Sequence, residues 1–111
     1  MARVVAAEIG AVLVDSAQGN EAEFRGQRVV LKSARPRTSL IGLTEGTLAR
    51  VDAVLAALGM PGDVFDVYQI PVAWYRDHMR RDVRPHVKRY YLRRSEIVGE
   101  CERIASVVVP A

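Results

Sequence analysis

The run Val29-Val30-Leu31 places the strongest constraint on how this chain can fold. Three consecutive apolar residues, two of them β-branched, are typical of a strand that is covered on both faces. The run belongs to segment 24–32, which has the pattern of a hairpin with Arg25-Gly26-Gln27 near its turn. We therefore expect a β-sheet with helices packed on it.

Two helices are predicted in the first half of the chain. The first covers residues 2–16, where apolar residues recur at helical spacing: Val5, Ile9, Val12 and Leu13. The second covers residues 45–58, with Thr44 as its N-cap and the apolar stripe Leu48, Val51, Leu55 and Leu58. The segment between the hairpin and the second helix, residues 33–43, is predicted to be loop.

The second half begins with the clearest strand of the sequence, residues 64–70. Pro71 can open a short helix with Val72, Tyr75 and Met79 on one face. Residues 80–86 are predicted to be a charged connection, and residues 88–92 an edge strand. Ser95 is then expected to cap a final helix with the stripe Ile97, Cys101, Ile104 and Val108.

These segments predict a single α/β domain over residues 1–111, with the element order α-β-β-α-β-α-β-α. The chain between the hairpin and the strand at 64–70 is long enough for a parallel crossover. We therefore expect a small mixed β-sheet flanked by helices. One shared core is expected, formed by Ile9, Val12, Val30, Leu48, Val51, Leu55, Val67, Ile97 and Ile104.

Length and composition narrow the class of protein further. A chain of 111 residues supports one cooperative core, and its 50% apolar content excludes a disordered polar tail. No apolar run approaches the ~20 residues of a membrane span, and the N-terminus does not resemble a cleaved signal peptide. The single cysteine excludes a disulfide framework and a multi-cysteine zinc site. We expect a cytoplasmic protein with no membrane partner.

The basic residues are concentrated in two segments, although the net charge of +3 is modest. Residues 25–37 contain five basic residues and no acidic one, and residues 76–94 contain eight basic residues against Asp77 and Asp82. All but two of the basic residues are arginine, which suits bidentate contact with phosphate. If both segments lie on one face, they favour nucleic acid as partner, DNA more than RNA. The alternative is an ordinary solvated face.

Two adjacent tyrosines accompany the second basic segment. Because Tyr90 and Tyr91 follow each other in a predicted strand, they point to opposite faces, and we expect one in the core and one exposed. An exposed tyrosine among arginines can stack on a base. It can equally anchor a protein partner.

Residues 23–33 resemble the core hairpin of the PD-(D/E)XK restriction-endonuclease-like fold. In that family a helix carries a glutamate, the first hairpin strand an aspartate, and the second strand ends in acid-x-Lys. Here Glu8 lies in the first predicted helix, Glu23 on the first hairpin strand and Lys32 near the end of the second. The resemblance covers residues 4–80, and it implies catalytic roles for Glu8, Glu23 and Lys32 with Mg²⁺ as cofactor.

The sequence departs from that family at Val30, which stands at the acid of acid-x-Lys. Metal-dependent cleavage needs two carboxylates on Mg²⁺ and a lysine near the attacking water, so Val30 leaves the metal one ligand short. We therefore predict a catalytically incomplete core with no metal site and no cofactor. An active Mg²⁺-dependent nuclease is the one enzymatic alternative. In the structural alternative, Lys32 solvates a strand end and Glu23 pairs across the hairpin with Arg25 or Arg28.

The predicted function is nucleic-acid binding. The contacts are expected from Arg25, Arg28, Arg35, Arg37, Arg80, Arg81, Arg84, Lys88, Arg89, Tyr90, Arg93 and Arg94. The rival function is that of an interaction protein, a subunit or regulator that docks on a partner or forms a homodimer. It would use Tyr90, Tyr91 and the apolar face of the last helix.

Overall fold

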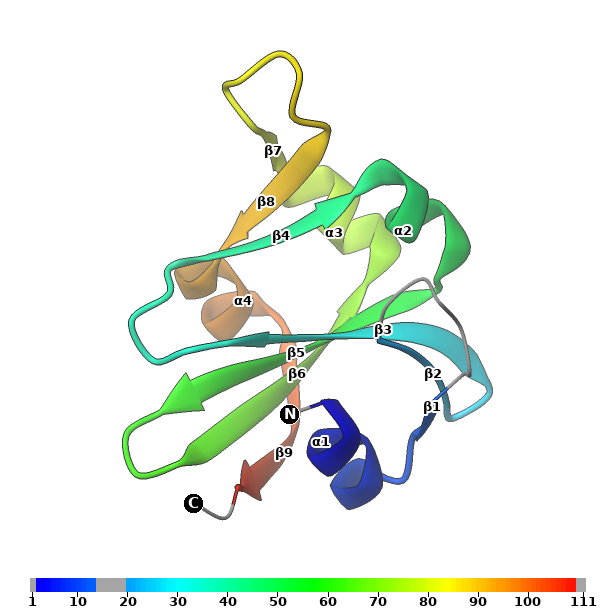
Figure 1. Cartoon of the computed structure of the whole chain (residues 1–111), viewed down its shortest axis with the longest axis vertical. Helices are drawn as coiled ribbons and strands as arrows, with labels where there is room; N and C mark the ends of the chain where they lie inside the picture. The colour runs from blue at the N-terminus through cyan, green and yellow to red at the C-terminus, as the bar shows by residue number, and fades with distance from the viewer. Residues whose placement is uncertain (1, 14–19, 110–111) are drawn as a thin grey trace.

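Two β-sheets share a layer of apolar side chains (Figure 1). The computed structural model describes residues 2–13 and 20–109. In these residues the larger sheet has the strand order β1-β2-β3-β5-β6-β9, and the smaller sheet has the order β4-β8-β7. The larger sheet comprises β1 (Val12–Leu13), β2 (Glu21–Phe24), β3 (Gln27–Ala34), β5 (Ala53–Met60), β6 (Val64–Pro71) and β9 (Glu102–Val108). The smaller sheet comprises β4 (Leu40–Thr44), β7 (Arg80–Arg81) and β8 (Arg89–Arg93), and the helices are α1 (Ala2–Ile9), α2 (Glu45–Arg50), α3 (Val72–His78) and α4 (Arg94–Glu100).

The predicted hairpin is confirmed and is formed by β2 and β3. Its turn consists of Arg25 and Gly26, whose φ angles are 50° and 78°. Positive φ at both positions gives a turn whose twist matches that of the antiparallel strands. Gly26 adopts this conformation without a side-chain penalty.

β3 pairs in parallel with β5, and the chain passes between them through β4 and α2. Val29, Val30 and Leu31 are all buried, as predicted for a strand covered on both faces. The predicted parallel crossover therefore exists, but it leads to residues 53–60. The strand predicted at 64–70 is confirmed as β6, and it runs antiparallel to β5. The larger sheet is thus mixed.

The predicted helix over 45–58 is wrong beyond Arg50. Thr44 is the N-cap as predicted, since its hydroxyl accepts a hydrogen bond from the Thr47 backbone N at 3.3 Å. After Arg50 the chain forms β5, in which residues 53–59 are all buried. Pairing with β3 on one side and β6 on the other overrides the helical spacing, because a run that is apolar at every position suits a doubly covered strand.

The first and last predicted helices are also shorter than expected. α1 ends at Ile9, Gly10 follows with a φ of 78°, and residues 12–13 pair with β2 instead of continuing the helix. Residues 14–16 of that prediction lie outside the described part of the chain. At the other end, α4 stops at Glu100, and residues 102–108 form β9 at the edge of the larger sheet.

The remaining differences between the predicted and the observed elements lie in the smaller sheet and in the helices next to it. β4 occupies the end of the predicted loop at 33–43 and extends to Thr44, and β7 lies within the predicted connection at 80–86. The strand predicted at 88–92 is β8, which is the middle strand of its sheet and not an edge. α4 begins directly after β8, and its N-cap is Arg93. The predicted N-cap, Ser95, lies inside the helix. The short helix after Pro71 is confirmed as α3, with Tyr75 fully buried.

The core has two parts, one on each face of the larger sheet, so the prediction of one shared core is wrong. The part under α1 includes Leu55 and Val67, and Ile9 and Ile104 pack against it partly buried. The part between the two sheets includes Val30, Leu48, Val51 and Ile97, together with Tyr75, Ile41 and Leu92. The Val12 side chain lies outside what the structure describes. None of the helices in the described residues has the length and hydropathy to cross a bilayer.

Candidate nucleic-acid interface

The smaller sheet has one face in the core and one open face. Side chains alternate between the two faces along a strand. On the inner face, Ile41, Leu43 and Leu92 are buried against the larger sheet. On the outer face, Leu40 and Arg93 are direct cross-strand partners, and both are exposed. We call this second face the outer sheet face.

Tyr91 is the aromatic residue of the outer sheet face. It pairs with Gly42 of β4 on one side and with Arg80 of β7 on the other. A Cβ atom added to Gly42 would lie 2.6 Å from the ring carbon Cε1 of Tyr91, so the ring occupies the space that a side chain would fill. The missing side chain at Gly42 therefore allows the tyrosine to lie over the β4 backbone.

Tyr90 points the other way, as the alternation predicted. It packs partly buried against the inner core, and its backbone carbonyl accepts a hydrogen bond from the Tyr75 hydroxyl at 2.7 Å. Both tyrosines are partly buried, so the expectation of one core and one exposed tyrosine holds only for their opposite orientation, and our predicted contact residue was Tyr90. The structure places Tyr91, which that prediction missed, on the outer sheet face.

A pocket of about 410 Å³ lies beside Tyr91. We call it the tyrosine pocket, and it is lined by Leu40, Arg80, Arg81, Asp82, Val83, Tyr91 and Arg93. Its one acidic residue is held by Arg84, whose Nε and Nη2 donate to the Asp82 carboxylate at 3.0 Å each. These hydrogen bonds hold the pKa of Asp82 well below its usual range. The pocket therefore combines an aromatic ring, apolar side chains and an excess of positive charge.

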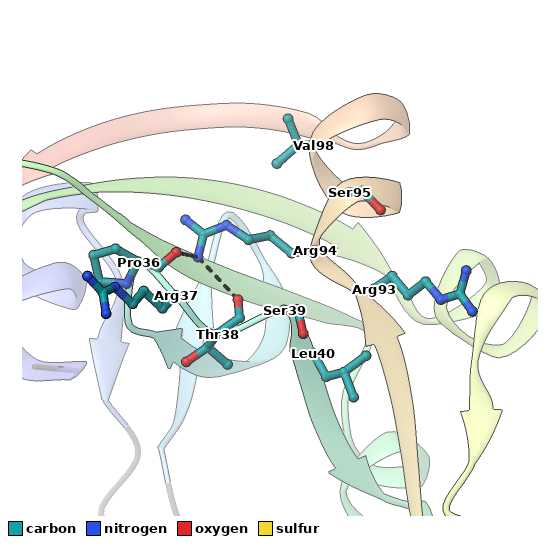
Figure 2. A pocket seen from close by; sticks show the side chains of 9 residues that line it. All are labelled: Pro36, Arg37, Thr38, Ser39, Leu40, Arg93, Arg94, Ser95 and Val98. Carbon is teal, nitrogen blue, oxygen red and sulfur yellow. Dashed lines mark hydrogen bonds between the residues drawn. The ribbon is translucent and has the colours of Figure 1, made fainter.

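A second pocket, of about 630 Å³, lies where the β3–β4 loop meets α4 (Figure 2). We call it the loop pocket, and it is lined by Pro36, Arg37, Thr38, Ser39, Leu40, Arg93, Arg94, Ser95 and Val98. Leu40 and Arg93 line both pockets, so the two hollows are adjacent on the surface.

Neighbouring arginines have different roles at this junction. Arg94 Nη1 donates to the carbonyl oxygens of Arg35, Pro36 and Thr38 at 3.0–3.3 Å, and Nη2 donates to that of Gly59 in β5. Figure 2 shows Arg94 reaching toward the loop, whereas Arg93 points away from it. Arg94, a predicted phosphate contact, is thus occupied in holding the loop to the larger sheet.

Several other predicted contact residues are also in ion pairs. Arg80 lies 2.7 Å from Glu96, Arg84 lies 3.0 Å from Asp82, and Arg28 lies 3.3 Å from Glu21. In the described residues, seven cations in or beside the smaller sheet have no acidic partner: Arg35, Arg37, Arg81, Lys88, Arg89, Arg93 and the carbonyl-bound Arg94. Of these cations, Arg89 and Arg93 lie on the outer sheet face with Tyr91, and the others lie in or beside the smaller sheet.

The first basic segment is divided between two places. Arg25 lies at the hairpin turn, with its guanidinium 4.8 Å above the Phe24 ring. Arg28 is the second residue of β3 in the same hairpin. Arg35 and Arg37 follow the opposite end of β3 and lie in the loop that leads to β4. Only the loop arginines are thus next to the smaller sheet.

The three residues implied as catalytic do not all lie on one face of the larger sheet. Glu8 is exposed on α1, which packs on the face that contains Leu31. Lys32 follows Leu31 and points to the opposite face, where it is half-buried. Burial, and secondarily the charge of Arg89, lowers the pKa of Lys32. Glu23 is exposed and lies 3.9 Å from Arg28, its cross-strand partner.

The buried acid of this region is Glu21, which is 1% exposed and directly opposite Val30 in the hairpin. Two arginines hold its carboxylate: Arg28 Nη2 lies 3.3 Å from Oε1, and Arg50 Nε and Nη2 donate to Oε2 at 3.3 and 3.2 Å. In the described part of the chain, no three His, Cys, Asp or Glu residues gather in a metal-binding arrangement. The acid nearest the Val30 position is thus engaged by guanidinium groups.

The fold and these contacts define a small mixed α/β domain with a basic, tyrosine-bearing outer sheet face. No protein-family model matches the sequence, and no curated protein is detectably similar to it. The restriction-endonuclease-like resemblance therefore stays a prediction that rests on residues 23–33 and on the order of the elements.

Proposed function

We propose that this protein binds nucleic acid through the outer sheet face. The observation that carries the proposal is the separation of the arginines into two groups. One group, which includes Arg80 and Arg84 in and beside the smaller sheet, is engaged by Glu21, Glu45, Glu96, Asp82 or Asp66. Arg81, Arg89 and Arg93 have no such partner among the described residues: Arg89 and Arg93 flank Tyr91 on the same face of β8, and Arg81 lines the tyrosine pocket from β7. Unpaired guanidinium groups next to a partly exposed aromatic ring are suited to phosphates and bases.

The proposal includes a restriction-endonuclease-like core that lacks complete metal chemistry. Val30 offers no ligand, and the buried carboxylate opposite it is engaged by Arg28 and Arg50. A carboxylate held by two guanidinium groups is a poor ligand for Mg²⁺, because the cation would have to displace them. DNA is the expected ligand in preference to RNA.

The test is the salt dependence of binding, measured by fluorescence anisotropy with labelled duplex DNA and single-stranded RNA between about 50 and 200 mM salt. The triple variant Arg81→Gln, Arg89→Gln, Arg93→Gln should flatten the slope of log K against log salt by about two to three units. A matched triple variant, Arg25→Gln, Arg76→Gln, Arg103→Gln, changes the net charge equally but away from this face. It should keep a steeper slope than the first. Absence of binding by the unaltered protein at low salt, or equal losses in both variants, would contradict the proposal.

A protein partner or a second copy of the chain is the alternative function. Three exposed apolar residues favour it: Leu40 is 46%, Val83 94% and Val98 53% exposed, and all three line the two pockets. Arginine and aromatic residues are also common anchors of protein interfaces. This function predicts a concentration-dependent dimer in analytical ultracentrifugation, weakened by Val83→Asp, with no binding of nucleic acid.

A further inference from the structure

We infer, resting on the proposed function, that the ligand is single-stranded and that one unpaired base enters the tyrosine pocket. A base inside a duplex is paired on its edge and stacked on both faces, so it cannot offer its ring to a concave pocket. A single strand can turn its bases outward, and aromatic side chains are the usual surfaces on which such bases stack. The aromatic wall of this pocket is therefore informative about the form of the ligand.

The Tyr91 ring is held in place before a ligand arrives. It lies over Gly42, at a position where any larger residue would collide with it. Leu40 and Val83 add apolar surface to the same pocket. A preformed aromatic and apolar wall suits the face of a base, because little ordering of side chains is needed on binding.

The charges around the pocket suit the phosphate that accompanies that base. Arg81 and Arg93 line it without an acidic partner among the described residues. Arg80 is engaged by Glu96 at 2.7 Å, and Asp82 is engaged by Arg84. Arg93, which shares the outer sheet face with Tyr91, is thus the unpaired guanidinium positioned to bind phosphate, Arg81 adds positive charge from β7, and the acid in the lining is already neutralised.

The adjacent loop pocket indicates where the strand continues. Arg93 and Leu40 form the boundary between the two hollows, so a phosphate on Arg93 would join nucleotides on either side of it. The loop pocket presents the hydroxyl side chains of Ser39 and Ser95 together with Arg37. Hydroxyls can pair with base edges. We therefore expect the bound strand to cross Arg93 from one pocket to the other.

The test compares three labelled DNAs of about 12 nucleotides. The first is single-stranded, the second is the duplex of the same sequence, and the third is a single strand in which every nucleotide is abasic. The abasic strand keeps the phosphates and lacks the bases. Binding to the normal single strand should be roughly 5- to 100-fold tighter than binding to the abasic strand.

Two variants locate the base. Tyr91→Ala should lower the affinity for the normal strand toward that for the abasic strand, which should itself change little, whereas Tyr91→Phe should keep most of the difference. Gly42→Ala retains the aromatic residue but displaces its ring, and it should weaken binding to the normal strand in the same direction. Circular dichroism spectra and unfolding curves of each variant show whether the fold is retained.

The outcomes separate this inference from the proposed function. Equal affinity for the normal strand, the duplex and the abasic strand, all weakened by the arginine triple variant, would contradict base insertion and leave nucleic-acid binding in place. Equal effects of Tyr91→Ala on the normal and abasic strands would also contradict it. No binding to any of the three DNAs would contradict the proposed function itself.

Discussion

Arg50 holds the buried carboxylate of Glu21 with two hydrogen bonds, from Nε at 3.3 Å and from Nη2 at 3.2 Å. Arg50 ends α2, and Glu21 begins β2, so the contact fastens the crossover to the hairpin. The pair differs from the surface ion pairs of this chain because one partner is completely buried. A buried carboxylate that loses a donor keeps its desolvation cost without compensation.

Arg50→Met should therefore lower the free energy of unfolding by about 1–3 kcal/mol, with Arg28 retaining part of the interaction. Urea unfolding followed by circular dichroism measures this. Arg76→Met is the matched control, since Arg76 pairs with the exposed Glu45, and its effect should be clearly smaller. Equal effects of the two variants would mean that burial of Glu21 adds nothing to its ion pair.

Leu55→Ala should cost about 2–5 kcal/mol of unfolding free energy, because Leu55 is completely buried in the central strand β5. Val83→Ala, at a residue that is 94% exposed, should change stability by less than about 0.5 kcal/mol. A loss below about 1 kcal/mol for Leu55→Ala would show that α1 and its layer of the core contribute little.

The Cys101 thiol should react slowly with iodoacetamide at neutral and mildly alkaline pH. Burial, and secondarily the nearby Glu100, raises its pKa to about 11, so little thiolate forms in the folded state. The alkylation rate should rise with an apparent pKa near 11, against one near 9 in urea. The folded state favours the protonated thiol, so this contribution to stability is complete below pH 9 and declines toward pH 11. The same apparent pKa with and without urea would contradict this.

Arg93→Gln and Arg94→Gln should change different properties, although the two residues are adjacent in the chain: the first should change nucleic-acid binding and the second the stability of the fold. Arg93→Gln should reduce the salt slope of nucleic-acid binding by about 0.7–0.9 and leave stability nearly unchanged. Arg94→Gln should leave the slope unchanged and lower the unfolding free energy by about 1–3 kcal/mol, because four backbone carbonyls lose their donor. Anisotropy titrations and urea unfolding on both proteins separate the roles. A reduced slope for Arg94→Gln would assign that arginine to phosphate after all.

No Mg²⁺- or Mn²⁺-dependent cleavage of DNA or RNA is expected. The reason is that Val30 supplies no ligand and Glu21 is engaged by arginines. A gel assay with each metal ion, and with EDTA as blank, checks this. Hydrolysis that disappears in Lys32→Ala would restore the enzymatic alternative.

The elements that could be predicted from the sequence are those whose signals are local. The hairpin, β6 and α3 have their turn residues, β-branched residues or opening proline within their own segments. β5 could not be predicted, because Leu48, Val51, Leu55 and Leu58 fit helical spacing equally well. The choice is made by tertiary pairing: β5 pairs with the following strand β6 and with β3, which is separated from it by β4 and α2. β9 was missed for the same reason, since its apolar residues continue the stripe of α4.

The candidate site was predictable only in part. The concentration of arginines between residues 76 and 94 coincides with β7 and β8 of the smaller sheet, and alternation predicted that one tyrosine would face outward. Which arginines are available depends on acids supplied by other elements, such as Glu96 for Arg80, or on carbonyls such as those around Arg94. Sequence spacing contains no information about such partners. The choice between Tyr90 and Tyr91 depends likewise on which face of the smaller sheet is covered.

The contact from Arg94 to the Gly59 carbonyl ties one wall of the loop pocket to the central strand of the larger sheet. The Arg94 backbone N also donates to the Ser39 carbonyl oxygen at 2.8 Å. Both the side chain and the main chain of Arg94 therefore form hydrogen bonds with the loop. Opening this pocket by local unfolding would break bonds that belong to the most buried strand. We therefore expect the hydrogen-bonded Arg94 amide to exchange with solvent much more slowly than the amides of the exposed β3–β4 loop, and a bound ligand to slow exchange in β5 as well as at Arg94.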